Sequence, residues 1–197
     1  ISSDDMLIVD SYEGKVIINP DSQTIDSYLV RQLSLDALRS EQQQVATQTV
    51  EYEGESVAVT ANAGSVDDVV KAIEAGADGV GLFRSEFLYL NNSVEPTEEE
   101  QYHVYSAAAK ACNGRPLTIR TLDIGGDKAV PYLGFEREEN PFLGWRAIRV
   151  SLDMEQMFCR QLRAILRASS VGDVRVMFPM VTTLEELTEA KQVLEKC

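Results

Sequence analysis

The sequence is poor in the residues that most often mark a redox centre, a metal site or a disulfide framework. Its 197 residues include one histidine, one tryptophan and three cysteines. The cysteines are Cys112, Cys159 and Cys197, and their odd number and wide spacing match neither a disulfide framework nor a zinc site. We interpret Cys112 and Cys159 as helix residues, and nothing around Cys197 indicates an activated thiolate.

Long apolar runs and positive charge are also scarce. No apolar run approaches the roughly 18 residues that cross a bilayer, and no basic start followed by an apolar core indicates a secretory signal, so a cytoplasmic location is expected. Lysine and arginine number 18 against 32 aspartates and glutamates, which gives a net charge of −14. Because such a field repels phosphate backbones and anionic lipid, we expect no nucleic-acid or membrane partner.

What the chain does have is the composition of a folded domain and an uneven charge. Hydrophobic residues make up 44% and charged residues 25% of the sequence, which is typical of a globular protein. Residues 1–113 hold 6 basic and 20 acidic side chains, whereas residues 114–197 hold 12 of each. A small anion can still bind where arginines concentrate positive potential, so the arginine positions are more informative than the total charge.

The first 48 residues differ in pattern from the rest. Two β-branched runs at residues 7–10 and 15–19 predict a β-hairpin, which alone is marginal in water and therefore indicates the end of a larger domain. Residues 21–46 then have helical spacing with a polar end, which predicts an exposed connector helix.

From residue 49 the pattern alternates between strand and helix. We predict a hairpin over 51–56 and strands over 57–61, 79–83, 117–122 and 174–178. We predict helices over 65–76, 97–112, 143–152 and 154–169, and one that begins at Thr183, with capping boxes at Ser65, Thr97 and Thr183. Repeated β-α units with right-handed crossovers predict an α/β fold, a partial (β/α)8 (TIM-type) barrel of about four βα units.

Three segments place an arginine near the boundary of a predicted element: residues 79–86, 118–128 and 139–149, with Arg84, Arg120 and Arg146. The planar guanidinium group binds a phosphate or a carboxylate through two parallel charge-assisted hydrogen bonds, so these segments predict an anion site. In the second segment a glycine-rich turn brings Lys128 to the same region.

Structural roles are the alternatives for these cations. Arg84 could pair with Glu86, and Arg120 with Asp123. Arg146 and Arg149 lie three residues apart and are predicted on one helical face, where both could be structural; we favour Arg146 as the ligand-binding residue.

Two other rare residues have ordinary interpretations. His103 lies in an acidic helical segment, which predicts a surface histidine without a catalytic role. Trp145 is interpreted as a packing anchor for its loop.

The three arginine segments resemble the Enzyme I family of the bacterial phosphoenolpyruvate-dependent sugar phosphotransferase system, and the resemblance runs through essentially the whole chain. It implies that Arg84 and Arg120 hold phosphoenolpyruvate, with Lys128 and Arg146 near its phosphate. It also implies an Mg²⁺-dependent homodimeric enzyme that passes phosphate from its own histidine to the carrier protein HPr. The phosphorylated histidine, the Mg²⁺ carboxylates and the catalytic cysteine of the family have no match here, so this chain is predicted to hold no catalytic or metal-binding residue.

The resemblance divides the chain into three parts. Residues 1–20 would be the C-terminal end of the swivelling phosphohistidine domain, 21–48 a linker helix, and 49–197 the N-terminal half of the phosphoenolpyruvate-binding barrel.

Two alternatives to this family stay open. One is the barrel of a pyruvate phosphate dikinase or phosphoenolpyruvate synthase, which shares the arginine pattern. The other is a catalytically inert binding or assembly module that self-associates through open strand edges.

Overall fold

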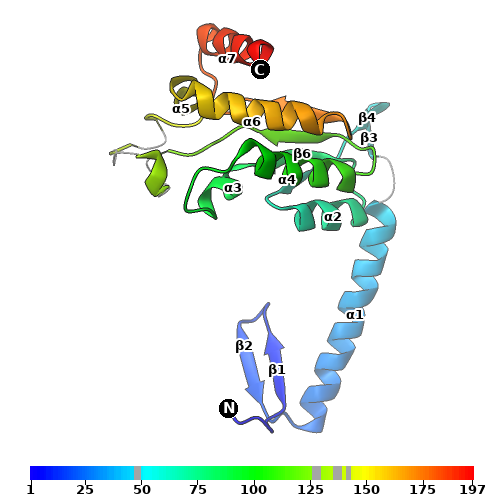
Figure 1. The fold of residues 1–197 in the computed structure, drawn as a ribbon. Helices are drawn as coiled ribbons and strands as arrows, with labels where there is room; N and C mark the ends of the chain where they lie inside the picture. Colours follow the sequence, from blue (N-terminus) through cyan, green and yellow to red (C-terminus); the bar gives the residue numbers. More distant parts are fainter. Residues whose placement is uncertain (47–49, 126–129, 135–138, 141–142) are drawn as a thin grey trace. The chain divides into compact units, whose positions relative to one another are not determined.

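The computed structural model of the chain describes residues 1–46, 50–125, 130–134, 139–140 and 143–197 (Figure 1). The chain divides into two units, residues 1–48 and 49–197, and each is described by itself. No helix in the described ranges is both long and apolar enough to cross a membrane.

The first unit is a hairpin followed by a long helix. Strands β1 (Leu7–Asp10) and β2 (Lys15–Ile18) are antiparallel, and α1 (Ser22–Ala46) follows, so both predicted elements are confirmed. Arg31 of α1 reaches back to the hairpin, with its Nη1 2.9 Å from Oδ2 of the buried Asp10. This ion pair connects the helix to the hairpin across 21 residues of sequence.

The second unit is built on a four-stranded parallel sheet in the order β5-β6-β7-β8. Its strands are β5 (Ala61–Ala63), β6 (Val80–Arg84), β7 (Leu117–Arg120) and β8 (Val174–Met177). A separate hairpin of β3 (Val50–Tyr52) and β4 (Glu55–Val57) precedes the sheet, as predicted. The unit is therefore a mixed α/β fold with a parallel sheet.

Helices α2 (Val66–Glu74), α4 (Glu98–Ala111) and α6 (Glu155–Ala168) cover one face of this sheet (Figure 1). The core between them is fully buried and contains Phe83, Ile119, Tyr105 and Ile165. Because side chains alternate along a strand, the neighbours Thr118 and Arg120 of β7 point to the opposite face, where both are only partly buried.

The second unit also contains α3 (Glu86–Leu90), the 3₁₀ turn η1 (Pro131–Leu133), α5 (Ile148–Asp153) and α7 (Leu184–Lys196). Helix α7 packs on α5 and α6 through Ala190 and Val193. The predicted capping boxes at Thr97 and Thr183 are both confirmed, and Ser65 caps α2 through Asp68 N at 3.1 Å.

Two predictions about elements are wrong, and one element was not predicted. The strand expected over 57–61 is β5 at 61–63, and Val57 and Val59 are exposed rather than buried. The helix expected over 143–152 begins only at Ile148, because Ala147 has a left-handed φ of 52° that a helix cannot continue through. Helix α3, a five-residue segment directly after β6, was not predicted.

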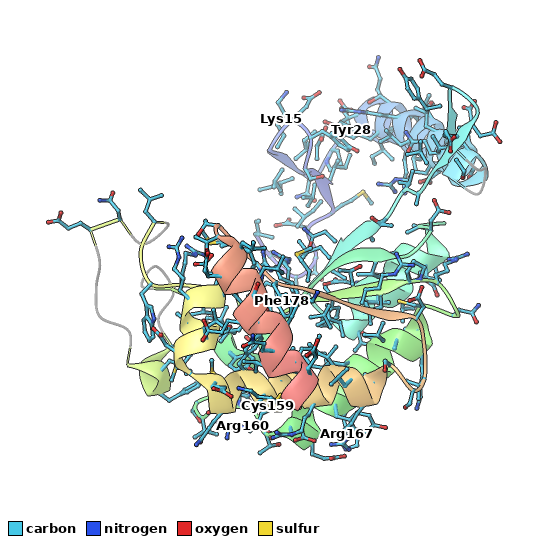
Figure 2. The ribbon with its side chains drawn as sticks, turned by 90° about the horizontal axis from the view of Figure 1, so that it is seen from above. Lys15, Tyr28, Cys159, Arg160, Arg167 and Phe178 are labelled. Atoms are coloured by element: carbon cyan, nitrogen blue, oxygen red, sulfur yellow. A yellow bond between two sulfur atoms is a disulfide. The ribbon has the colours of Figure 1, made fainter. Side chains whose placement is uncertain are left out.

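The prediction for the cysteines is also wrong in part. Cys159 of α6 and Cys197 are joined in a disulfide, and Cys159 is labelled in Figure 2. Their Cα atoms are 5.8 Å apart across 38 residues of sequence, because α7 packs on α6. Only tertiary packing brings them together, so spacing could not reveal the pair. Cys112 is a buried free cysteine at the end of α4, as expected.

Candidate anion-binding site

Arg84 and Arg120 occupy paired positions at the carboxyl ends of β6 and β7. The two residues are partners in the register of this parallel pair, and each is the last residue of its strand. Neighbouring strands lie about 4.8 Å apart, so two cations are placed side by side. Like charges in such a pair repel one another, so the position requires nearby negative charge from the protein or from a ligand.

Arg120 receives that charge from two carboxylates. Its Nη2 lies 2.6 Å from Oε1 of Glu86, and its Nη1 lies 3.0 Å from Oδ2 of Asp123. The pair of Arg120 with Asp123 is one of the alternatives that the sequence left open. The other alternative paired Glu86 with Arg84, but Glu86 pairs with Arg120 at the end of the neighbouring strand. Held on two sides, the guanidinium group has a fixed orientation, which preorganises it for a ligand.

Arg146 joins the same cluster. Its Nη2 lies 3.0 Å from Oδ1 of Asp123, so one carboxylate bridges Arg120 and Arg146. The expectation that Arg146 and Arg149 share a helical face is wrong, because Arg146 lies before α5, which begins at Ile148. Arg149 instead donates to the carbonyl oxygens of Leu143 and Gly144, at 2.9 Å and 2.7 Å.

Arg84 differs from its partner because no acidic side chain in the described ranges pairs with it. Its guanidinium carbon lies 4.7 Å from the centre of the Phe87 ring, a cation–π contact. Its Nε is buried and has no hydrogen-bond partner among the described residues; the same is true of Nε of Arg120. Two buried N–H donors on adjacent strand ends are what an incoming anion would satisfy.

Gly64, which directly follows β5, leaves room for this cation. A Cβ atom at Gly64 would lie 2.6 Å from Cε2 of Phe87 and 3.4 Å from Nη2 of Arg84. The first distance is a clash, so a side chain here would displace the ring on which Arg84 stacks.

Among the described residues, guanidinium groups outnumber carboxylates in this cluster. Arg120 and Arg146 pair with Glu86 and Asp123, and Arg84 stacks on Phe87. In a chain with a net charge of −14, this local excess of positive charge favours a small anion over a nucleic acid.

The remaining predicted residues lie elsewhere or outside the described ranges. Lys128 falls outside the described residues. His103 of α4 is exposed, with its Nε2 3.3 Å from Oε1 of Glu99, so the expected surface histidine is confirmed. Trp145 packs on the buried cluster that includes Leu122 and Ile124, as expected of an anchor.

Within the part of the chain that the structure describes, no three His, Cys, Asp or Glu side chains are grouped in a way that could hold a metal ion. We therefore assign no metal ligand to these residues.

Phe87 and Gly64 were not predicted from the sequence as parts of the site, and Glu86 was considered only as a partner of Arg84. The signals were present but weak: Gly64 follows a short strand at the same sheet edge as Arg84, and Glu86 and Phe87 open the short helix α3.

The chain is similar to a known family over most of its length. Residues 38–197 match the family model described as PEP-utilising enzyme, PEP-binding domain, where PEP is phosphoenolpyruvate. The chain belongs to this family of PEP-utilising enzymes. The match covers Arg84, Arg120 and Arg146 together with the whole sheet.

Several curated relatives bear one name, phosphoenolpyruvate-protein phosphotransferase. The protein of Bacillus sp. (strain S) is 46% identical over 98% of this chain, and that of Staphylococcus carnosus is 44% identical over 100%. The protein of Haemophilus influenzae is 42% identical over 99% of the chain. The chain spans about a third of the length of these relatives, 34% in each case. Among the PEP-utilising enzymes considered from the sequence, these names favour the phosphotransferase over a dikinase or synthase.

Proposed function

We propose that this chain is the phosphoenolpyruvate-binding part of a phosphoenolpyruvate-protein phosphotransferase. The observation that carries the proposal is the register pair of Arg84 and Arg120, each with a buried Nε–H donor that lacks a partner among the described residues. Phosphoenolpyruvate presents a carboxylate and a phosphate, so two adjacent guanidinium groups can hold one anionic group each. Arg146, fixed by Asp123, and Lys128 are proposed to lie near the phosphate.

The proposed chemistry is transfer of the phosphoryl group to a histidine of the enzyme. Such transfer passes through a loose transition state in which negative charge grows on the departing enolate. Fixed cations stabilise that charge without reorganising during the reaction. Arg120, held by Glu86 and Asp123, suits this task because its position does not depend on the ligand.

The rest of the enzyme is proposed from the family. Residues 49–197 would form the first half of a TIM-type barrel, which the parallel order β5-β6-β7-β8 and the arginines at the carboxyl ends of the strands support. Residues 1–20 would end the phosphohistidine domain, and 21–48 would form the linker. The intact enzyme would be a homodimer in the cytoplasm, where it would use Mg²⁺ held by residues outside this chain and pass phosphate to HPr for sugar uptake.

The test is autophosphorylation from labelled phosphoenolpyruvate in the full-length protein that contains this chain. Arg120→Ala is expected to lower the rate by several orders of magnitude, because it removes a fixed cation from the transition state. Arg115→Ala is the control. Arg115 lies just before β7, at the amino end of the strand and away from Arg120, and donates to Ile73 O at 3.2 Å. A near-normal rate for Arg120→Ala would refute the proposed function.

For residues 1–197 alone we propose no turnover and self-association. Strands β5 and β8 each have one neighbour in the sheet and present an open edge to another chain. Light scattering that shows a monodisperse monomer would contradict the association, and phosphoryl transfer by residues 1–197 alone would contradict the lack of turnover.

A further inference from the structure

Helix α6 carries one amide on its buried face. Gln161 lies between Phe158 and Leu162 and is 1% exposed. A buried amide costs stability unless its donors and acceptor are paired, so its partners show what it is there to hold.

The partners of Gln161 belong to two different strand ends. Its Oε1 accepts a hydrogen bond from Leu122 N at 2.9 Å, just beyond β7. Its Nε2 donates to Ser85 Oγ at 3.0 Å, just beyond β6, and to the Tyr105 hydroxyl at 3.1 Å. One side chain therefore ties together the segments that follow Arg84 and Arg120.

Ser85 extends this connection to the arginine itself. Its hydroxyl accepts from Gln161 and donates to the carbonyl oxygen of Arg120 at 2.6 Å. The residue after Arg84 is thus bonded to the backbone of Arg120, and Gln161 is bonded to Ser85 and to Leu122, two residues after Arg120.

We infer that Gln161 is a positioning residue for phosphoenolpyruvate: it sets the distance between the carboxyl ends of β6 and β7 and thereby between Arg84 and Arg120. The inference rests on the proposed function, because it assigns a role in that same site. Gln161 itself does not touch the ligand. An amide is suited to the role because it offers one acceptor and two donors in a fixed plane, which no apolar side chain of similar size can supply.

The network has an internal control in Gln101 of α4, which is 0% exposed. Gln101 accepts from the hydroxyls of Tyr89 and Tyr105 at 3.3 Å and 3.2 Å and donates to Pro96 O at 3.1 Å. It is as buried as Gln161 and makes as many bonds, and the two amides share the Tyr105 hydroxyl, but Gln101 has no bond to Ser85 or to Leu122. Loss of either amide should destabilise the fold, and only the loss of Gln161 should disturb the arginines.

The experiment compares Gln161→Leu with Gln101→Leu in the full-length protein. We measure KM and kcat for phosphoenolpyruvate together with unfolding in urea, and a direct titration of phosphoenolpyruvate into the unmodified protein. For Gln161→Leu, kcat/KM is expected to fall about 10- to 100-fold, with KM raised, because a shift of about 1 Å in a positioned group has such an effect. For Gln101→Leu, kcat/KM should stay within about twofold at a comparable loss of stability, because Gln101 has no bond to Ser85 or to Leu122.

Equal kcat/KM values for the two variants would overturn the positioning role. If Gln161→Leu does not fold, Ser85→Ala decides the question: KM should rise about fivefold for the loss of one hydrogen bond, and an unchanged KM would overturn the inference. If the unmodified protein fails to bind phosphoenolpyruvate, the proposed function falls and the inference with it. If the unmodified protein binds phosphoenolpyruvate and Gln161→Leu has normal kinetics, the positioning role of Gln161 is refuted while the proposed function stands.

Discussion

Nη2 of Arg120 lies 2.6 Å from Oε1 of Glu86, in a pair whose side chains are only 17% and 4% exposed. The pair joins the end of β7 to the start of α3, and so crosses from one strand end to the next. Two adjacent cations at paired positions would otherwise repel, and this buried carboxylate compensates part of that repulsion.

Replacing Glu86 by glutamine should therefore destabilise the second unit. Breaking a buried ion pair by neutralising one partner costs up to 3 to 5 kcal/mol, and since Arg120 keeps Asp123 we expect about 2 to 3 kcal/mol in urea unfolding. Asp173→Asn is the matched control, because Asp173 and Arg175 form an exposed pair of 2.9 Å in the same unit. It should cost less than about 1 kcal/mol. Equal losses in the two variants would contradict a structural role for the Glu86 pair.

A methyl group at Gly64 should weaken phosphoenolpyruvate binding. The Cβ of Gly64→Ala would lie 2.6 Å from Cε2 of Phe87, so the ring and the stacked Arg84 must move. We expect a loss of affinity of about tenfold, measured by calorimetric titration of the full-length protein. Gly172→Ala is the control, since its Cβ would crowd only Ala109 at 3.3 Å, before the start of β8. An unchanged affinity of Gly64→Ala for phosphoenolpyruvate would show that ligand binding by Arg84 does not require the space next to Gly64.

The contact between α4 and α6 should depend on pH through Glu98. A hydrogen bond from Arg163 lowers the pKa of Glu98 below its ordinary value of 4.5. Partial burial raises this pKa and Arg167 lowers it further, and the net shift is downward. Figure 2 labels Arg160 and Arg167, which lie on the same helix as Arg163. Because the folded-state pKa is the lower one, the stabilisation is fully present above the ordinary pKa and is lost as pH falls through the folded value.

Glu98→Gln should therefore lower the free energy of unfolding by about 0.5 to 1 kcal/mol at pH 7. The difference from the unmodified chain should persist down to about pH 5 and shrink below it. Glu185→Gln, which also removes a carboxylate from the first turn of a helix, is the control, since Glu185 has no ion pair among the described residues. A Glu98 effect that does not change with pH would contradict the ionic origin.

Reduction of the disulfide between Cys159 and Cys197 should lower the stability of the packing between α6 and α7. The bond closes a loop of 38 residues, and the chain-entropy estimate for such a loop is about 3 to 4 kcal/mol. Thermal unfolding with and without reductant measures the effect. The Cys112→Ser variant should show the same difference, because Cys112 is free. Alkylation of all three cysteines in denaturant without reductant would show that the bond is not formed.

Much of the fold could be predicted because it is determined locally. The apolar runs of β6, β7 and β8 and the capping boxes at Thr97 and Thr183 are signals contained within a few residues. The start of α5 was not predictable, because φ of 52° at Ala147 is imposed by tertiary contacts, among them the bond from Ala147 N to Ile124 O at 3.2 Å.

The candidate site was predictable in part for the same reason. Arginine at or just after the end of a predicted strand is a local pattern, and it made Arg84 and Arg120 candidates. Arg146 became a candidate from a loop-and-helix segment instead. The partners were not local: Glu86 reaches Arg120 across 34 residues, and Gln161 reaches Ser85 across 76. The one available signal for Gln161 was an amide on the otherwise apolar face of its helix, between Phe158 and Leu162.

The most direct test of the central claim is the dissociation constant of phosphoenolpyruvate for the Arg84→Ala variant of the full-length protein, measured beside Arg115→Ala. Removal of a guanidinium group that binds one anionic group of the ligand should raise the dissociation constant at least about tenfold, equivalent to a charge-assisted hydrogen bond of about 1.4 kcal/mol or more. Arg115→Ala should bind as the unmodified protein does. Equal affinities for phosphoenolpyruvate in the unmodified protein and in Arg84→Ala would contradict the claim that the two paired arginines hold this ligand.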